Sequence, residues 1–193
     1  MSYLIIGLAL FLGIHSVRIF ADTWRTAQIA RRGEGAWKGL YSLASAVGLG
    51  LIIWGYGQAR QQPVVLWASP PWTRHAASLL VLISFVLLAA AYVPKNGIRH
   101  RLHHPMVLGV KVWAFAHLLA NNTLADLLLF GSFLVWAVLD FRSARQRDRV
   151  GHVTYAPGTL GNTLITVAIG TIAWLVFAVW VHTWLIGVSA LRG

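Results

Sequence analysis

Histidine is the residue type best suited to chemistry in this chain, and two of its eight histidines stand inside apolar sequence. His15 lies in "GIHSVRIF", and His117 lies in "HHPMVLGVKVWAFAHLLANN". Neither has a carboxylate neighbour in sequence. An ionisable side chain at membrane depth costs a few kcal/mol on insertion scales and is therefore a hypothesis for a functional site. A neutral imidazole in an apolar site is a good ligand for haem iron held between helices.

Three further residues stand at or inside apolar stretches. His104 precedes Pro105, and a residue before proline is pushed away from the α region, whereas proline suits the first helical position. We therefore expect His104 to be a pre-helical or capping residue. Lys111 lies inside the stretch that ends with His117 and either snorkels to the interface or faces a site. His75 stands at an outer boundary and fits either role.

The remaining histidines favour ordinary roles. The motif H-x-x-H-H at residues 100–104 lies among basic residues, and without acidic neighbours or a second ligand cluster it is little evidence for zinc. His152 is expected in a loop. His182, between Trp180 and Trp184, is typical of an interface residue.

Other catalytic chemistry is largely excluded. The chain has no cysteine, which rules out disulfides, thiolate metal sites and thiol redox chemistry. It shows no Gly-rich phosphate loop and no pairing of a nucleophile with a base. The five acidic residues are all expected at helix boundaries or in loops, so paired-carboxylate catalysis is not expected: Asp22, Glu34, Asp126, Asp140 and Asp148. Buried chemistry would then depend on imidazole, with or without a metal cofactor.

The elements that must position these residues are membrane helices. The chain is 58% hydrophobic and only 11% charged, whereas a soluble domain carries about a quarter charged residues. Five runs are long enough to cross a bilayer, at about residues 3–20, 40–57, 75–93, 124–141 and 163–186. None alternates with period two, so a β-barrel is not expected. The first run lacks a preceding basic region and is expected to stay as a span. We predict an all-α polytopic membrane protein with a single domain, residues 1–193.

A sixth span is predicted from loop charge. The apolar stretch 106–120 is only fifteen residues long and contains Lys111. If it crosses, segments 21–39, 94–101 and 142–149 share one side with eleven Lys and Arg. The other side then has three: Arg60, Arg74 and Arg192. If it does not cross, the bias falls to seven against seven. The positive-inside rule therefore favours six helices in a bundle with both termini outside the cytoplasm. The net charge of +11 is read as this orientation signal, not as a nucleic-acid surface.

Local sequence supports the sixth helix. Asn121, Asn122 and Thr123 predict a tight turn, and Thr123 could cap the next helix above Asp126. The fourth and fifth helices would then form an antiparallel hairpin. Aromatic residues fall near the outer ends in this arrangement, as a membrane-interface belt should: Trp54, Tyr56, Trp67, Trp72, Trp180 and Trp184.

These residues resemble the NnrU family of integral membrane proteins over most of the chain. The resemblance is most specific in "HHPMVLGVKVWAFAHLLANNTLADLLLFGSF", with support from "GIHSVRI" and "YVPKNGIRHRLHHP". It implies a multi-pass protein of the bacterial inner (cytoplasmic) membrane that is needed for normal production of nitrite and nitric oxide reductases. A related branch is the plant 15-cis-ζ-carotene isomerase, which carries haem b with histidine ligands and isomerises a carotenoid when the haem is reduced.

Carried over by position, the resemblance implies haem b with His15 and His117 as axial ligands. His104 and His75 match further histidines that are important in the isomerase branch. The chain departs from that branch at Ala114, where the isomerase has a cysteine, and in "LVWAVLDF", where a further histidine is absent. These departures exclude thiolate switching and count against carotenoid isomerisation, whereas haem binding is less affected.

Depth along the helices points to a different pairing of the histidines. At about 1.5 Å per residue, His15 lies nearer the cytoplasmic face and His117 nearer the outer face. Depth matching would pair His15 with His104, and His117 with His75. A haem standing along the membrane normal, or uneven helix starts, would reconcile this difference in depth with the ligand pair that the resemblance implies.

Three functions stay open on sequence alone. The first is a membrane haem b protein that supports nitrite and nitric oxide reduction through redox or sensing chemistry, with a redox partner or a small apolar substrate; as an enzyme it would be a haem-dependent isomerase or redox protein. The second is a transporter or assembly factor for reductase maturation, with Lys111, Asn121 and Asn122 lining a pathway. The third is a purely structural membrane subunit.

Overall fold

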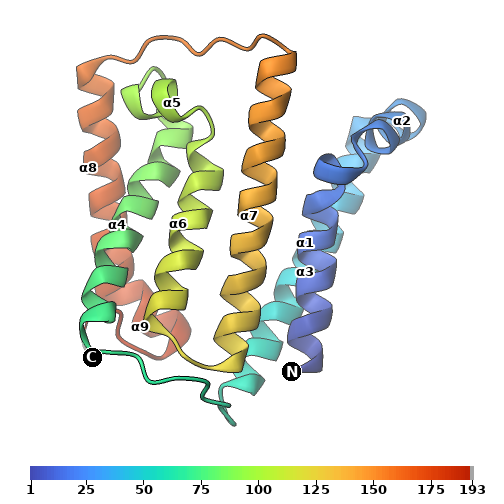
Figure 1. Cartoon of the computed structure of the whole chain (residues 1–193). Helices are drawn as coiled ribbons and strands as arrows, with labels where there is room; N and C mark the ends of the chain where they lie inside the picture. Colours follow the sequence, from blue (N-terminus) through green and yellow to red (C-terminus); the bar gives the residue numbers. More distant parts are fainter. Residues whose placement is uncertain (192–193) are drawn as a thin grey trace.

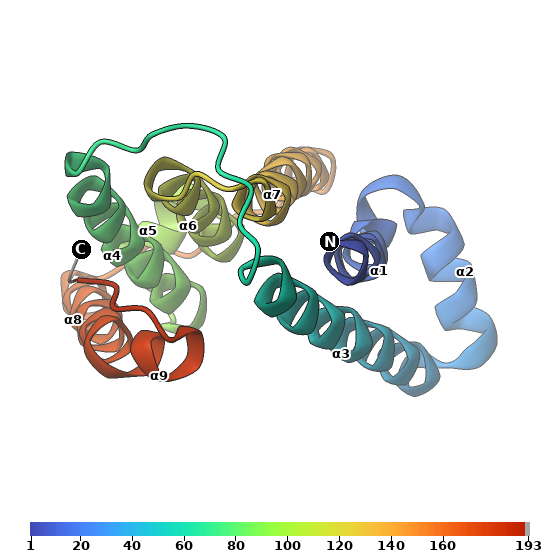
Figure 2. The same ribbon diagram turned by 90° about the horizontal axis from the view of Figure 1, so that it is seen from below.

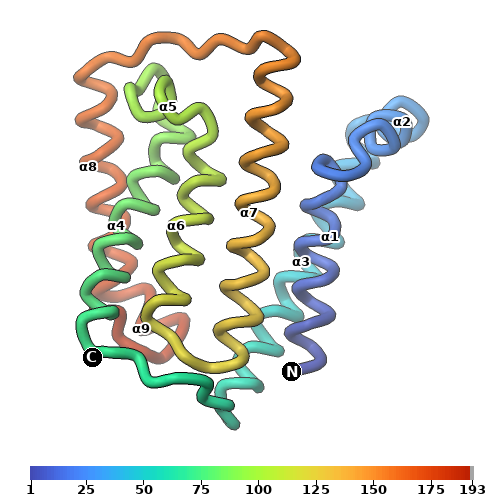
Figure 3. The backbone as a smooth tube through the Cα atoms, in the orientation of Figure 1, coloured from blue at the N-terminus to red at the C-terminus, as the bar shows by residue number. Residues whose placement is uncertain are grey.

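The computed structural model describes residues 1–191, which are helical throughout apart from connections and two isolated β-bridges (Figures 1 and 3). Its elements are α1 (Ser2–Phe20), α2 (Asp22–Arg32), α3 (Glu34–Ala59), α4 (Trp72–Tyr92), α5 (Gly97–Leu102), α6 (Pro105–Ala120), α7 (Leu124–Val150), α8 (Leu160–Val176), the π-helical turn η1 (Phe177–Val181) and α9 (His182–Ile186). The all-α prediction is confirmed.

Five of the helical segments are long and apolar enough to cross a membrane, so the chain is a multi-pass membrane protein in a lipid bilayer. They are α1, α3, α4, α7 and the continuous run Leu160–Ile186. The prediction of six such helices is slightly off, because α6 has only 16 residues. At 1.5 Å per residue it is about 24 Å long, somewhat less than a hydrocarbon core of about 30 Å.

The path of α6 nevertheless brings the basic segments together. It runs antiparallel to both α4 and α7, so that α2, α5 and the α7–α8 connection share one end of the molecule (Figure 1). We call this the basic end, because it contains segments 21–39, 94–101 and 142–149. Segment 142–149 is not the loop that the sequence predicted, since α7 continues as a helix to Val150. Arg192, counted at the other end, lies outside the described residues.

The turn between α6 and α7 has the predicted cap. The Thr123 side chain accepts from the Asp126 amide while the Asp126 carboxylate accepts from the Thr123 amide, which is a complete capping box. Asp126 is buried and also accepts from the Tyr56 hydroxyl at 2.5 Å. The α3–α4 connection pairs with this turn, because the Leu66 amide donates to the Asn122 carbonyl at 2.8 Å.

Helices α1 and α3 approach so closely that glycine is required between them. A Cβ added to Gly55 would stand 2.2 Å from the backbone nitrogen of Leu4, and one added to Gly7 would stand 2.6 Å from that of Ile52. Small residues at helix contacts allow this approach, and van der Waals packing drives association in lipid. The α4–α6 contact is held differently, by a hydrogen bond from the buried Ser84 hydroxyl to the Gly109 carbonyl at 2.8 Å.

The helices form two groups that meet at α7. Seen along the bundle, α1, α2 and α3 stand to one side of α4, α6, α7 and α8 (Figure 2). Helix α7 packs on α6 and also contacts α1 and, less extensively, α3. The buried apolar core lies at this junction and includes Leu4, Leu8, Ile52, Leu129 and Phe130.

Candidate functional site

His15 lies on α1 with one ring nitrogen fixed by the helix backbone. Its Nδ1 stands 2.7 Å from the Phe11 carbonyl oxygen, which can only accept a hydrogen. The neutral ring therefore carries its proton on Nδ1 and leaves the lone pair on Nε2, which has no hydrogen-bond partner among the described residues. The ring stacks on Phe11 with centroids 4.2 Å apart and contacts Tyr41 and the edge of Trp136.

His117 repeats this arrangement on α6. Its Nδ1 lies 2.8 Å from the Trp113 carbonyl oxygen, one helical turn earlier. The ring stacks on Phe130 of α7 at a centroid distance of 4.6 Å and tilts against Trp113 at 5.0 Å. Its Nε2 also has no hydrogen-bond partner within residues 1–191. Both histidines thus have the form in which a neutral imidazole binds a metal.

The structure does not place these two imidazoles side by side. Phe11 contacts Phe133 at 5.8 Å and Phe133 contacts Trp113 at 5.6 Å, so three rings stand in series between them. His15 lies level with Trp136, whereas His117 lies level with Phe130, six residues earlier on α7. At 1.5 Å per residue this is a depth difference of about 9 Å.

His104 has an acidic partner that its sequence neighbourhood does not show. Its Nε2 lies 2.8 Å from Oδ2 of Asp148, and the Tyr155 hydroxyl donates to the same oxygen at 3.0 Å. His103 Nδ1 stands 3.5 Å away from that oxygen. We call His103, His104, Asp148 and Tyr155 the Asp148 cluster. Burial, and next the bond to Asp148, raise the pKa of the Tyr155 hydroxyl above its usual value.

His104 occupies the predicted position before Pro105, but its side chain does not cap α6. Its ring serves the Asp148 cluster instead. The depth argument from sequence would make this ring a ligand together with His15, which stays a prediction. The His104 Nε2 is already engaged, however, so the ring is less available than that of His15 as a metal ligand.

The rest of the H-x-x-H-H motif also faces the α7–α8 connection. His100 Nδ1 lies 3.0 Å from the Tyr155 carbonyl oxygen, and the His103 ring packs on the Tyr155 ring at 4.2 Å. Within residues 1–191, no group of three His, Cys, Asp or Glu side chains could hold a metal ion. The motif joins α5 and the start of α6 to this connection.

His75 and Lys111 lie apart from these contacts. His75 is exposed in the first turn of α4, and within the described residues its side chain has no hydrogen bond or ring contact. Lys111 is half-buried in the middle of α6 and has no ion pair in that part of the chain. Asn121 donates to the His117 carbonyl at 2.8 Å and Asn122 to the Trp67 carbonyl at 2.7 Å. Both amides therefore fix backbone at the end of α6.

A third imidazole of the same form, His182, was expected only as an interface residue. It begins α9 directly after the π-helical turn, a feature often found at functional sites. Its Nδ1 lies 2.7 Å from the Val188 carbonyl oxygen, six residues later. The sequence pattern did not indicate this bond, because it depends on the turn at Gly187 that follows α9.

The fold and these side chains define a multi-pass helical membrane protein with backbone-fixed imidazoles at membrane depth. A family model described as NnrU protein matches residues 3–190, nearly the whole chain. The chain therefore belongs to the NnrU family, as the sequence resemblance indicated. No curated protein and no solved structure matched the chain.

Proposed function

We propose that this NnrU-family protein binds haem b through His15 and His117 and supports nitrite and nitric oxide reduction by redox or sensing chemistry. The observation that carries the proposal is the shared hydrogen bond from each Nδ1 to the carbonyl four residues earlier. Metal-ligating histidines characteristically donate their second ring N–H to a carbonyl or carboxylate, which fixes the ring and frees the other nitrogen.

The space between the two imidazoles is occupied in this structure. Phe11, Phe133 and Trp113 form aromatic walls there, in series from His15 to His117. Bound haem b would supply one-electron chemistry and an iron able to bind a diatomic gas. The Phe11 and Trp113 carbonyl oxygens fix the orientation of the two imidazoles and leave each Nε2 without a partner in the described chain. Ligation of one iron by both histidines requires those walls to open, so the two ligands are tested separately.

Optical spectra of the purified protein test haem binding. We expect a Soret band with one haem per chain and a shift on reduction. His15→Ala and His117→Ala should each change the spectrum, whereas His152→Ala, in an exposed connection, should not. Absence of stoichiometric haem would overturn the proposal. A spectrum changed by His182→Ala and His117→Ala but not by His15→Ala would instead assign His182 as the partner of His117.

The cellular role is tested in the native host. Removal of the gene should lower nitrite reductase and nitric oxide reductase production, and the unaltered gene should restore it. The His117→Ala gene should fail to restore it, while the His152→Ala gene should succeed. Restoration by His117→Ala at equal protein level would separate the family role from haem binding. We also propose that the chain resides in the bacterial inner membrane with its basic end in the cytoplasm and both termini periplasmic, because Lys and Arg gather at that end.

Transport or assembly for reductase maturation is a second candidate, favoured by Lys111. A half-buried ammonium without an ion pair in the described chain is unusual at the middle of a membrane helix. This candidate ranks lower because Asn121 and Asn122 are engaged with backbone carbonyls. Uptake into proteoliposomes that is abolished by Lys111→Met, in a protein without bound haem, would favour it.

A further inference from the structure

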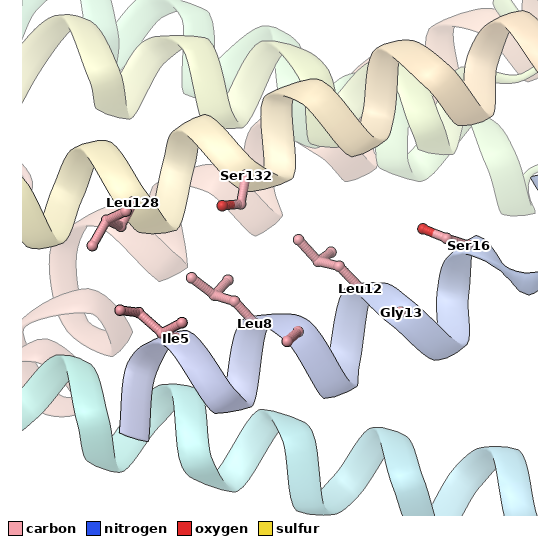
Figure 4. Close-up of a pocket in the computed structure, with 8 residues that line it drawn as sticks. Ile5, Leu8, Leu12, Gly13, Ser16, Leu128 and Ser132 are labelled. Carbon is pink, nitrogen blue, oxygen red and sulfur yellow. The ribbon is translucent and has the colours of Figure 1, made fainter. Parts of the chain in front are cut away.

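A groove runs along the seam between α1 and α7, on the side of α1 away from α3 (Figure 4). It has two adjoining lobes with volumes of about 340 and 440 Å³. Leu12, Ser16 and Ser132 line both lobes. One lobe continues past Leu8 and Leu128, and the other continues to Trp136, whose edge contacts the His15 ring. Because the walls are apolar membrane helices, an occupant would enter from the lipid.

Two hydroxyl groups in this groove lack protein partners. A serine in a helix commonly donates back to the carbonyl four residues earlier, as Ser45 does to Tyr41 at 2.7 Å. Ser16 and Ser132 make no such bond, and neither has any hydrogen-bond partner within residues 1–191. They stand on opposite walls of the groove (Figure 4).

The ring of Trp136 forms a wall of the same groove. Trp136 lines the lobe nearest His15, while its indole Nε1 is buried and so does not face the groove space. Ser16 and Ser132 therefore give an otherwise apolar groove two unused hydrogen-bond donors beside a flat aromatic wall.

We propose that this groove binds a membrane-soluble molecule of the quinone class. The apolar lining suits a lipophilic molecule, the two hydroxyls on opposite walls suit the two carbonyl oxygens of its head, and Trp136 suits a flat ring. A hydrocarbon such as a carotenoid or an acyl chain would fill the volume but leave both hydroxyls unpaired. The inference goes beyond the proposed function and does not rest on haem, since none of the groove residues is a proposed iron ligand.

Two glycines allow the groove to be closed selectively. A Cβ added to Gly13 would meet nothing within 4 Å, and one added to Gly131 would meet only the end of Leu127 at 3.9 Å. Gly13 lines the first lobe and Gly131 the second. A larger side chain at either position would therefore project into open groove space. Gly50 on α3 is equally open but lies outside the groove, which makes it a matched control.

The test is equilibrium binding of radiolabelled decylubiquinone to the full chain in nanodiscs of zwitterionic lipid. We expect saturable binding near one per chain. Ser16→Ala and Ser132→Ala should each weaken binding about 2- to 10-fold, the effect of one lost hydrogen bond. Gly131→Leu should abolish it. Ser45→Ala and Gly50→Leu should leave it unchanged.

Competition identifies the chemistry that is recognised. Decylbenzene, which has a similar tail but no carbonyl oxygen, should displace decylubiquinone only weakly. Equal displacement, or unchanged affinity in both serine variants, would show that the groove takes hydrocarbon without recognition and would overturn the proposal. Unsaturable partition, unaffected by Gly131→Leu, would overturn it as well. Haem content is measured in the same samples: quinone binding without haem overturns only the proposed function, and haem without quinone binding overturns only this inference.

Discussion

At the scale of single residues, one carboxylate oxygen of Asp148 contacts three side chains at the basic end. Oδ2 of Asp148 accepts from the Tyr155 hydroxyl and pairs with His104, while the His103 ring lies beside it. The side chain of Asp148 is only 14% exposed, so these bonds are partly shielded from water. Hydrogen bonds to a charged group are stronger than neutral ones. We therefore expect this oxygen to hold the α7–α8 connection against α5 and α6.

Replacing Asp148 by Asn should destabilise the protein by about 1–3 kcal/mol, because the charge-assisted bonds to His104 and Tyr155 are lost or weakened. The matched control is Asp22→Asn, whose partner Arg25 lies 3.4 Å away in a more exposed pair. Thermal unfolding in detergent, followed by circular dichroism, measures both variants. Equal shifts in Tm would contradict a special role for the Asp148 cluster.

The Tyr155 hydroxyl gives this contact a defined dependence on pH. Its pKa is raised in the folded protein, chiefly by burial and then by Asp148. A raised folded pKa means that the contribution to stability is complete below the ordinary tyrosine pKa of about 10 and is lost as pH rises through the folded value. The Tm difference between the natural protein and Tyr155→Phe should therefore be constant near neutral pH and shrink above about pH 10. A Tm difference that grows above about pH 10 would contradict a raised pKa of Tyr155 in the folded protein.

Sequence predicted residue roles where the cause is local. Pro105 set the start of α6 and placed His104 before it, and Thr123 with Asp126 predicted the cap of α7. The partnership of His104 with Asp148 crosses 44 residues of sequence and depends on the packing of α6 against α7. No local pattern contains that information. The bonds from Nδ1 of His15 and His117 to carbonyls four residues earlier are local, and their helical spacing could have indicated them.

At the scale of elements, apolar length predicted the membrane helices but not their ends. The apolar run at 124–141 became α7, which extends to Val150 through four arginines. Backbone hydrogen bonds of a helix do not depend on side-chain polarity, so a helix continues beyond the apolar segment that crosses the lipid. The same reason explains α2, a polar helix that hydropathy does not detect. The π-helical turn before His182 had no sequence signal.

The α1–α3 contact depends on one missing side chain at its tightest point. We expect Gly55→Ala to destabilise the protein by about 1–3 kcal/mol, since the new methyl group would collide with backbone atoms of Leu4. Gly57→Ala is the control, because a Cβ there meets nothing within 4 Å and alanine favours helix. Thermal unfolding compares the two. A Gly55→Ala protein as stable as Gly57→Ala would mean that α1 and α3 can separate without loss.

At the scale of the whole molecule, the all-α fold was predictable from hydropathy, and the gathering of the basic segments at one end was predictable from loop charge. Hydropathy alone finds five helices, and α6 is too short to be counted with them. Its passage was inferred from the distribution of Lys and Arg, and the structure places the basic segments at one end (Figure 1). The packing of α1 on α7 was not predictable, because charge and hydropathy state on which side a segment lies but not which helices are neighbours.

Single introduced cysteines test this arrangement, because the natural chain has none. Arg101→Cys and Gln146→Cys should both be labelled by a membrane-impermeant thiol reagent only from the cytoplasmic side. Gln62→Cys, in the connection between α3 and α4, should be labelled only from the other side. Labelling of Arg101→Cys and Gln146→Cys from opposite sides would show that α6 does not cross. Inside-out and right-side-out vesicles provide the two measurements.

The meeting of the two helix groups at α7 has a consequence for how the protein is made. Helices α1 and α3 can pair as soon as both leave the ribosome, but they find α7 only after residues 60–123 have followed. The groove at the seam is therefore among the late features to be completed during synthesis. It also follows that a gene divided within the α3–α4 connection should yield two fragments that associate in the bilayer. Within residues 1–191, α7 is the helix of the second fragment that α1 and α3 contact.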